Sequence, residues 1–86
     1  MLQISGSIQE AKDSKQEAEI ESLIEKIDAD LYTEKIKTGE TPTRSKLIEI
    51  IENNDYGTVN EDGYSFTSKV GNYVIQFSEI IGWEED

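Results

Sequence analysis

The sequence predicts an α+β domain in which two helices pack on one face of a three- or four-stranded antiparallel meander sheet. Apolar residues recur with a helical period as far as Asp55 and with a twofold period after it, which indicates helices followed by strands. Asp62-Gly63 and Gly71-Asn72 separate three strand candidates, and both dipeptides suit two-residue hairpin turns, which need positive φ. A chain of 86 residues without internal repeats is expected to form one domain with a thin core.

The first residues fit two alternatives. Leu2, Ile4 and Ile8 alternate loosely with polar residues, and Gly6 interrupts the pattern. Such a segment either adds an edge strand to the sheet or remains a mobile arm. We therefore divide the chain into an N-terminal arm or edge strand at 1–13, a single α+β domain at 14–83 and an acidic tail at 84–86.

The clearest periodic signal predicts a helix from about residue 14 to about residue 36. Its apolar residues fall within about 100° of arc and form one amphipathic face. These residues are Ile20, Leu23, Ile24, Ile27 and Leu31. A second stripe beside that face is acidic, and each four-residue step along it rises by about 6 Å. It consists of Glu17, Glu21, Glu25 and Asp28.

A second helix is expected to begin with Thr41 as its N-cap and Pro42 at the first helical position, where the missing N–H costs nothing. Asn53, Asn54 and Asp55 should end it, because Asn and Asp tolerate the left-handed conformation. Its broad apolar face consists of Leu47, Ile48, Ile50 and Ile51.

Three strands are expected at Tyr56–Val59, Tyr64–Val70 and Tyr73–Ile80. Two-residue turns place Phe66 opposite both Val59 and Phe77, and residues opposite each other share a face of the sheet. The same turns pair Tyr64 with Glu79. The opposite face, which carries mostly polar residues, should be wet. The residues expected to be buried are Ile20, Leu23, Ile24, Ile27, Leu31, Leu47, Ile51, Phe66, Val70, Ile75 and Phe77.

The formal net charge of −11 is unevenly distributed. Residues 47–86 carry nine carboxylates against Lys69 alone, whereas residues 1–46 carry ten acidic and seven basic side chains. Same-sign charge on a small fold repels itself, so it is usually retained for solubility or for a positive partner. Nucleic acid and anionic lipid both need positive charge and are disfavoured as direct partners, and no apolar run is long enough to span a membrane.

The residue types disfavour catalysis and metal binding. The chain has no histidine and no cysteine, which removes the common proton shuttle, the soft metal ligands and the best nucleophile. Thr58–Gly63 resembles the first half of a calcium loop, but Lys69 occupies the place of the required bidentate Glu. We therefore expect no enzyme activity, no cofactor and no metal site. A chain without cysteine or a signal-peptide pattern fits a cytoplasmic location.

The expected binding surface is a group of carboxylates beside Trp83. The predicted register gathers Glu61, Asp62 and Glu79 at one end of the sheet, where the acidic tail leaves. This group would contact lysines and arginines of a partner, with Trp83 as a hot spot, or it would be a solvated hairpin tip that protects a sheet edge. The candidate partner-binding residues are Glu61, Asp62, Glu79, Trp83 and Glu84, followed by the helical stripe Glu17, Glu21, Glu25 and Asp28.

These features lead us to expect a small, acidic, non-catalytic protein inhibitor of a phage or mobile-element type. It would bind a basic partner that handles nucleic acid, as a DNA mimic whose carboxylates stand where phosphates would sit. One alternative is an immunity protein or antitoxin that caps a basic toxin. Another is a regulatory or scaffold subunit that binds through an apolar patch around Ile80–Trp83. In each case we expect the chain to be a monomer or a homodimer.

Overall fold

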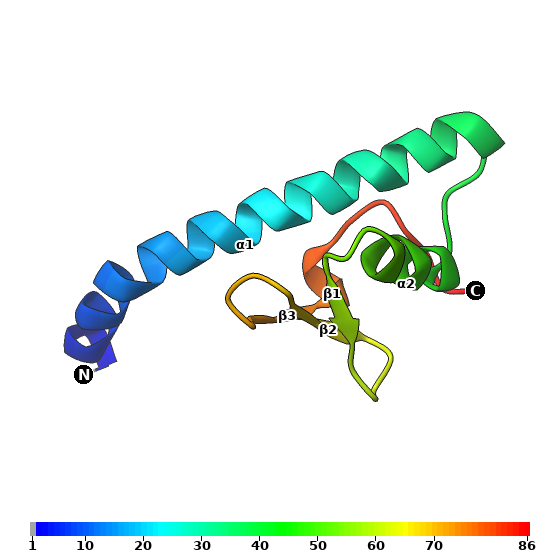
Figure 1. Ribbon diagram of the computed structural model, residues 1–86. Coiled ribbons are helices and arrows are strands. Elements are labelled where there is room, and N and C mark those ends of the chain that lie inside the picture. The colour runs from blue at the N-terminus through cyan, green and yellow to red at the C-terminus, as the bar shows by residue number, and fades with distance from the viewer. Residues whose placement is uncertain (1) are drawn as a thin grey trace.

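The computed structural model describes the backbone of residues 2–86 and the side chains of residues 15–86. Its elements are α1 (Leu2–Thr38), α2 (Arg44–Asn53), β1 (Gly57–Val59), β2 (Ser65–Ser68), β3 (Val74–Gln76) and the 3-10 helix η1 (Phe77–Glu79). The two helices pack with a three-stranded antiparallel sheet of order β1-β2-β3, which confirms the predicted α+β class. Figure 1 shows α1 along one side of the molecule, with α2 and the sheet below it in this view.

The first helix is longer than its apolar face predicted. α1 begins at Leu2, not near residue 14, and ends at Thr38. Of the two alternatives for 1–13, the edge strand is therefore wrong for the described backbone, residues 2–13, which is helical. Helix formers connect this segment to the amphipathic part without an intervening proline, so nothing stops the helix there. They are Glu10, Ala11 and Lys12.

The second helix begins two residues later than predicted. Its N-cap is Thr43, whose backbone is extended at φ −93° and ψ 173°. Thr43 is extended because it forms a parallel bridge with Glu84 of the C-terminal segment. The Glu84 N–H donates to the Pro42 carbonyl at 2.9 Å, and the Arg44 N–H donates to the Glu84 carbonyl at 2.8 Å. A long-range contact thus moves the helix start beyond the local Thr-Pro signal.

The end of α2 follows the prediction. Asn54 is the C-cap, and Asp55 adopts the left-handed conformation at φ 62°. The Tyr56 N–H donates to the Ile51 carbonyl at 2.9 Å, and the Asp55 N–H donates to the Glu52 carbonyl at 3.2 Å. These two bonds form a Schellman motif, which satisfies carbonyls that the helix leaves free at its end.

One predicted register is confirmed and the other is wrong by two residues. Phe66 lies opposite Val59 in β1, as predicted, but opposite Ile75 in β3 instead of Phe77. The reason is a four-residue loop, 69–72, closed by the Ser68 N–H on the Tyr73 carbonyl at 2.8 Å. A shift of two residues preserves the side-chain alternation, so Phe66 and Ile75 both remain in the core.

Ser68 explains why the loop is longer than two residues. Its hydroxyl accepts the Tyr73 N–H at 2.9 Å and donates to the Val70 carbonyl at 2.7 Å, so it bridges the loop from inside. Ser68 is 1% exposed, and the buried hydroxyl is satisfied by both bonds. Gly71 and Asn72 supply the two left-handed residues of the loop, with φ of 85° and 54°.

The core lies between α1, α2 and the sheet. Predicted residues Ile20, Leu23 and Ile24 are half-buried and pack against it, whereas Val70 is 70% exposed because it lies in the loop. The prediction for Val70 is therefore wrong. The fully packed residues are Ile27, Leu31, Leu47, Ile50, Ile51, Phe66, Ile75, Phe77 and Ile80. Within the described part of the chain, no helix combines the length and apolarity needed to cross a membrane.

Candidate functional site

One flank of α1 carries three exposed carboxylates in a row. Glu17, Glu21 and Glu25 are all exposed, and we call them the acidic row. They are spaced four residues apart, so each lies about 6 Å further along the helix axis. Among residues 15–86, no ion pair or hydrogen bond joins their side chains to another residue. Like charges at this spacing destabilise an isolated helix by a few tenths of a kcal/mol per pair, about 0.2–0.5.

Asp28, the fourth member of the predicted stripe, does not belong to the exposed row. It is half-buried next to the loop that follows η1, and its Oδ1 is buried without a hydrogen-bond partner. Burial raises the pKa of Asp28 above its ordinary value, and the charge of Glu25 adds to the rise, while the backbone N–H of Ile81 partly opposes it. Folding therefore disfavours the charged form of Asp28 relative to its neutral form.

An apolar patch continues this flank of α1 toward its C-terminal end. Tyr32, Ile36 and Ile81 are 66%, 65% and 75% exposed, and we call them the apolar patch. Tyr32 and Ile81 line one recess of about 290 Å³ together with Asp28. At about 100° per residue, Tyr32 and Ile36 lie on the side of α1 that also carries the acidic row.

Of the apolar patch predicted around Ile80–Trp83, Ile81 is exposed, whereas Ile80 is buried. Sequence reasoning missed the two helical members, Tyr32 and Ile36, although their signal was present. Tyr32 and Ile36 fall outside the apolar arc of the predicted helix, so their helical positions alone mark them as exposed. Ile81 could not be found in this way, because its place depends on the loop after η1. Gly82 at φ +90° turns that loop against α1, where the glycine lies next to Leu31.

Trp83, the predicted hot spot, makes its hydrogen bonds and a ring contact within the chain. Its indole N–H donates to the Ile80 carbonyl at 2.8 Å and to the Phe77 carbonyl at 3.2 Å. Its ring meets the Phe77 ring edge-on, with centroids 5.8 Å apart and planes at 77°. Trp83 is half-buried, and its indole N–H has no further hydrogen bond to give to a partner. Its position favours a structural role for the indole.

Arg44 lies between the β1–β2 turn and the acidic tail. Its Nη1 donates to the Gly63 carbonyl at 2.7 Å, its Nε is 3.8 Å from the Glu85 carboxylate, and its guanidinium lies 4.6 Å from the centre of the Tyr64 ring. The Tyr64 hydroxyl donates to the same Glu85 carboxylate at 2.9 Å, which raises the pKa of Tyr64. At the chain end, the Ser45 hydroxyl donates to Asp86 and lowers the pKa of that carboxyl. The tail is therefore docked, and a basic side chain partly offsets its charge.

One carboxylate of the predicted group at the turn, Asp62, is bonded within the turn. The Asp62 carboxylate accepts the Tyr64 N–H at 2.9 Å and the Ser65 hydroxyl at 3.1 Å, so it stabilises the turn itself. Glu61, Glu79 and Glu84 are exposed. The predicted pairing of Tyr64 with Glu79 is wrong, because the Tyr64 carbonyl accepts the Phe77 N–H at 2.8 Å and the 3-10 helix follows at once.

No cluster of acidic side chains in the described part of the chain suits a metal ion. Groups of three or more carboxylates close enough to share a cation are absent there. Because the chain has no histidine or cysteine, carboxylate oxygens would have to supply most side-chain ligands. We therefore name no residue as a metal or cofactor ligand.

Asp28→Asn is expected to stabilise the protein by up to about 1 kcal/mol at pH 7, because it removes the charge of a half-buried carboxylate and keeps the shape of the side chain. The folded-state pKa of Asp28 is raised, so the folded wild type takes up a proton more readily than the unfolded chain. The penalty in the wild type is therefore complete above the raised pKa and disappears as the pH falls below the ordinary value of 3.8. Urea denaturation of both proteins across this pH range measures the difference.

Asp30→Ala is the matched control on the same helix. The Asp30 carboxylate accepts the Tyr56 hydroxyl at 2.7 Å, and burial together with this bond raises the pKa of Tyr56 to about 12. Its removal should destabilise the protein by about 0.5–1.5 kcal/mol. If Asp28→Asn destabilises the fold at pH 7 as Asp30→Ala does, the Asp28 carboxylate has a stabilising partner and our interpretation of it is wrong.

Comparison with known proteins supplies no family for this chain. No protein-family model, no curated protein and no solved structure matches it. The acidic row, the apolar patch and the partly neutralised turn are therefore the features that bear on function.

Proposed function

We propose that this chain is a non-catalytic protein inhibitor that binds a basic, nucleic-acid-handling protein through the acidic flank of α1. The observation that supports this most is the continuity of the acidic row with the apolar patch on one side of one helix. The turn surface with Glu61, Asp62, Glu79, Trp83 and Glu84 becomes the second candidate. Arg44 offsets its charge, and Trp83 already has partners within the chain.

The two parts of the flank would contribute differently to binding. Exposed carboxylates at the rim of an interface mainly speed association and select a partner of opposite charge. Large apolar side chains that become buried slow dissociation, and aromatic residues are frequent among binding hot spots. The acidic row therefore supplies steering and selectivity, and Tyr32 with its two isoleucine neighbours supplies the anchor.

The form of the row favours a partner that normally binds nucleic acid. Its three charges are regularly spaced along one helix, and they have no cation partner among the side chains of residues 15–86. A nucleic-acid-binding groove presents lysines and arginines to a regular row of phosphates. Carboxylates on α1 can occupy such a groove and exclude the nucleic acid, and the net charge of −11 increases the attraction at long range.

The apolar patch also favours a second candidate, a regulatory or scaffold subunit. Three large apolar side chains, each at least 65% exposed, form a contact surface that does not require a charged partner. In this case the acidic row would serve solubility alone. An immunity protein or antitoxin for a basic toxin would instead use the same charges on a different target.

The test is a quantitative capture experiment from the native host. Wild type and the variant Glu21→Gln with Glu25→Gln are immobilised separately, and retained proteins are compared at about 50 mM and about 500 mM salt, where the Debye length differs about threefold. We expect one basic protein to be retained by wild type, depleted on the variant and released at high salt. Duplex DNA should compete with wild type for the purified partner.

The alternative outcomes separate the candidates. In one outcome, the variant and wild type retain the same partner equally well, and high salt fails to release it. This outcome supports the scaffold subunit and contradicts the charge-led proposal. A basic partner that binds in a salt-dependent way but ignores duplex DNA points to a capped toxin.

A further inference from the structure

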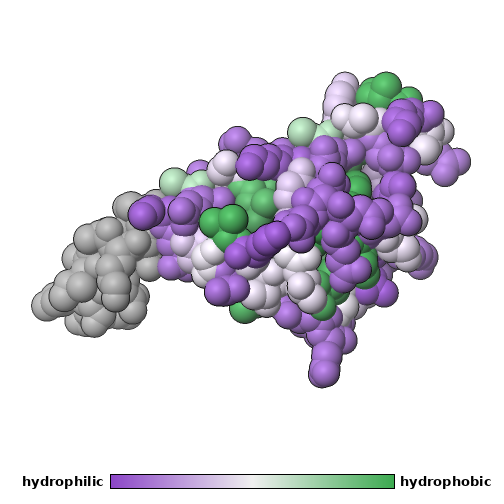
Figure 2. All heavy atoms as spheres, in the orientation of Figure 1, coloured by the Kyte–Doolittle hydropathy of each residue, from purple (hydrophilic) through white to green (hydrophobic). Residues whose placement is uncertain are grey.

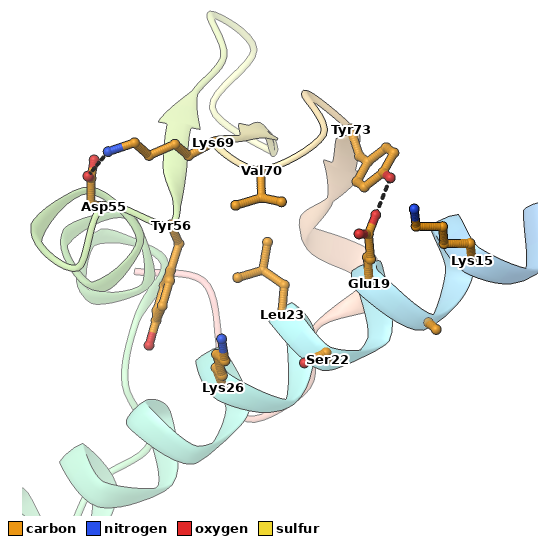
Figure 3. A pocket seen from close by; sticks show the side chains of 11 residues that line it. Lys15, Glu19, Ser22, Leu23, Lys26, Asp55, Tyr56, Lys69, Val70 and Tyr73 are labelled. Carbon is orange, nitrogen blue, oxygen red and sulfur yellow. Dashed lines mark hydrogen bonds and ion pairs between the residues drawn. The ribbon is translucent and has the colours of Figure 1, made fainter.

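A groove on the other flank of α1 separates that helix from the β2–β3 loop. It has a volume of about 580 Å³, within the size range of small-ligand pockets. Figure 3 shows Val70 from the loop and Leu23 from α1 facing each other across it, with Tyr73 at one end and Tyr56 at the other. Figure 2 shows apolar atoms on this face over the middle of α1, surrounded by hydrophilic residues.

The groove collects positive charge in an acidic protein. Lys15, Lys26 and Lys69 all line it, and they are three of the chain's eight basic residues. Two carboxylates also line it, but both have partners: Glu19 accepts the Tyr73 hydroxyl, and Asp55 pairs with Lys69. Among the side chains of residues 15–86, no carboxylate pairs with Lys26. The ammonium of Lys26 therefore lines the groove without an ion-pair partner among these side chains (Figure 3).

The lining next to Lys26 is apolar and partly exposed. Leu23 lies one helical turn before it, and Val70 is 70% exposed although it faces the groove. Both tyrosine hydroxyls are already hydrogen-bonded, that of Tyr73 to Glu19 and that of Tyr56 to Asp30. The two tyrosines therefore contribute mainly their aromatic rings to the lining of the groove. The lining therefore combines the ammonium of Lys26 with a partly exposed apolar surface.

We propose that this groove binds a small amphipathic anion whose head group pairs with Lys26 and whose apolar chain covers Leu23 and Val70. A charge-assisted contact to an ammonium contributes more than a neutral hydrogen bond, and the apolar chain gains from leaving water. A cationic amphiphile is disfavoured, because three lysines line the groove and Asp55 is paired with one of them, Lys69. The site does not depend on the proposed function, since it lies on the flank of α1 away from the acidic row.

The test uses calorimetric titration of the full chain with decanoate, and with decyltrimethylammonium as a cation of the same chain length. We expect saturable one-site binding of decanoate only. Lys26→Gln should weaken it about tenfold, since a lost charge-assisted bond costs roughly 1.5 kcal/mol. Val70→Asp should abolish it, and because Val70 is largely exposed, the variant should keep the wild-type melting temperature.

Lys37→Gln is the matched control, an exposed lysine of the same helix that does not line the groove. It should bind decanoate as wild type does. The proposal is overturned if decanoate shows no saturable binding at millimolar concentration, if the cation binds equally well, or if Lys26→Gln and Lys37→Gln have the same affinity.

Discussion

Phe66→Ala should lower the free energy of unfolding by about 3–5 kcal/mol, the usual cost of removing a buried aromatic side chain. Phe66 is fully buried, lies opposite Val59 and Ile75, and its ring centre is 6.5 Å from that of Phe77. A chain of 86 residues has a total stability of roughly 4–13 kcal/mol. The variant is therefore expected to be partly or wholly unfolded at 37 °C, as circular dichroism and urea denaturation would show.

Val74→Ala is the control for this prediction. Val74 lies in the neighbouring strand β3, but it points away from the core and is 61% exposed. Its truncation should change the stability by less than about 0.5 kcal/mol. Equal losses from the two substitutions would mean that Phe66 does not occupy the centre of the core.

Glu21→Lys with Glu25→Lys should weaken binding of the basic partner about 100-fold or more. Each change removes an attraction at the interface and adds a repulsion, and like charges brought together at an interface cost several kcal/mol. Both residues are exposed, so the fold should be retained. Affinities measured by surface plasmon resonance, with the wild-type and variant chains compared at the same salt concentration, provide the measurement.

Two matched variants locate the effect. Glu40→Lys with Glu52→Lys makes the same change in net charge at exposed sites outside both candidate surfaces, and it should weaken binding far less. Glu61→Lys with Glu84→Lys tests the turn surface and leaves Asp62 in place, because Asp62 stabilises the turn through the Tyr64 N–H. If this last variant loses the most affinity, the partner binds at the turn and not on α1.

The faces of the elements could be predicted from the sequence because they depend on local periodicity. The apolar arc of α1 and the alternation in the predicted strands Tyr64–Val70 and Tyr73–Ile80 identify Ile27, Leu31, Phe66, Ile75 and Phe77 as core, and all five are buried. A register error of two residues left these assignments intact. The loop that caused the error depends on the hydroxyl of buried Ser68, which twofold periodicity does not reveal.

The candidate site was harder to predict because it depends on contacts between distant segments. The chain end meets the start of α2 through Glu84, which places Arg44 next to the tail and partly offsets the predicted acidic group. The bend at Gly82 brings Ile81 next to Tyr32 and creates the apolar patch. Neither contact has a local signal in the sequence. The acidic row, which depends only on helical spacing, was found at Glu17, Glu21 and Glu25.

The dissociation constant of the complex with the captured basic partner, measured from about 50 to about 500 mM salt, distinguishes a charge-led interface from an apolar one. Over this range the Debye length falls from roughly 14 to roughly 4 Å, so exposed charges lose most of their mutual attraction. We predict that the affinity of wild type falls progressively, and that Glu21→Lys with Glu25→Lys shows a much shallower dependence. An affinity of wild type that stays constant across the range would contradict binding through the acidic row.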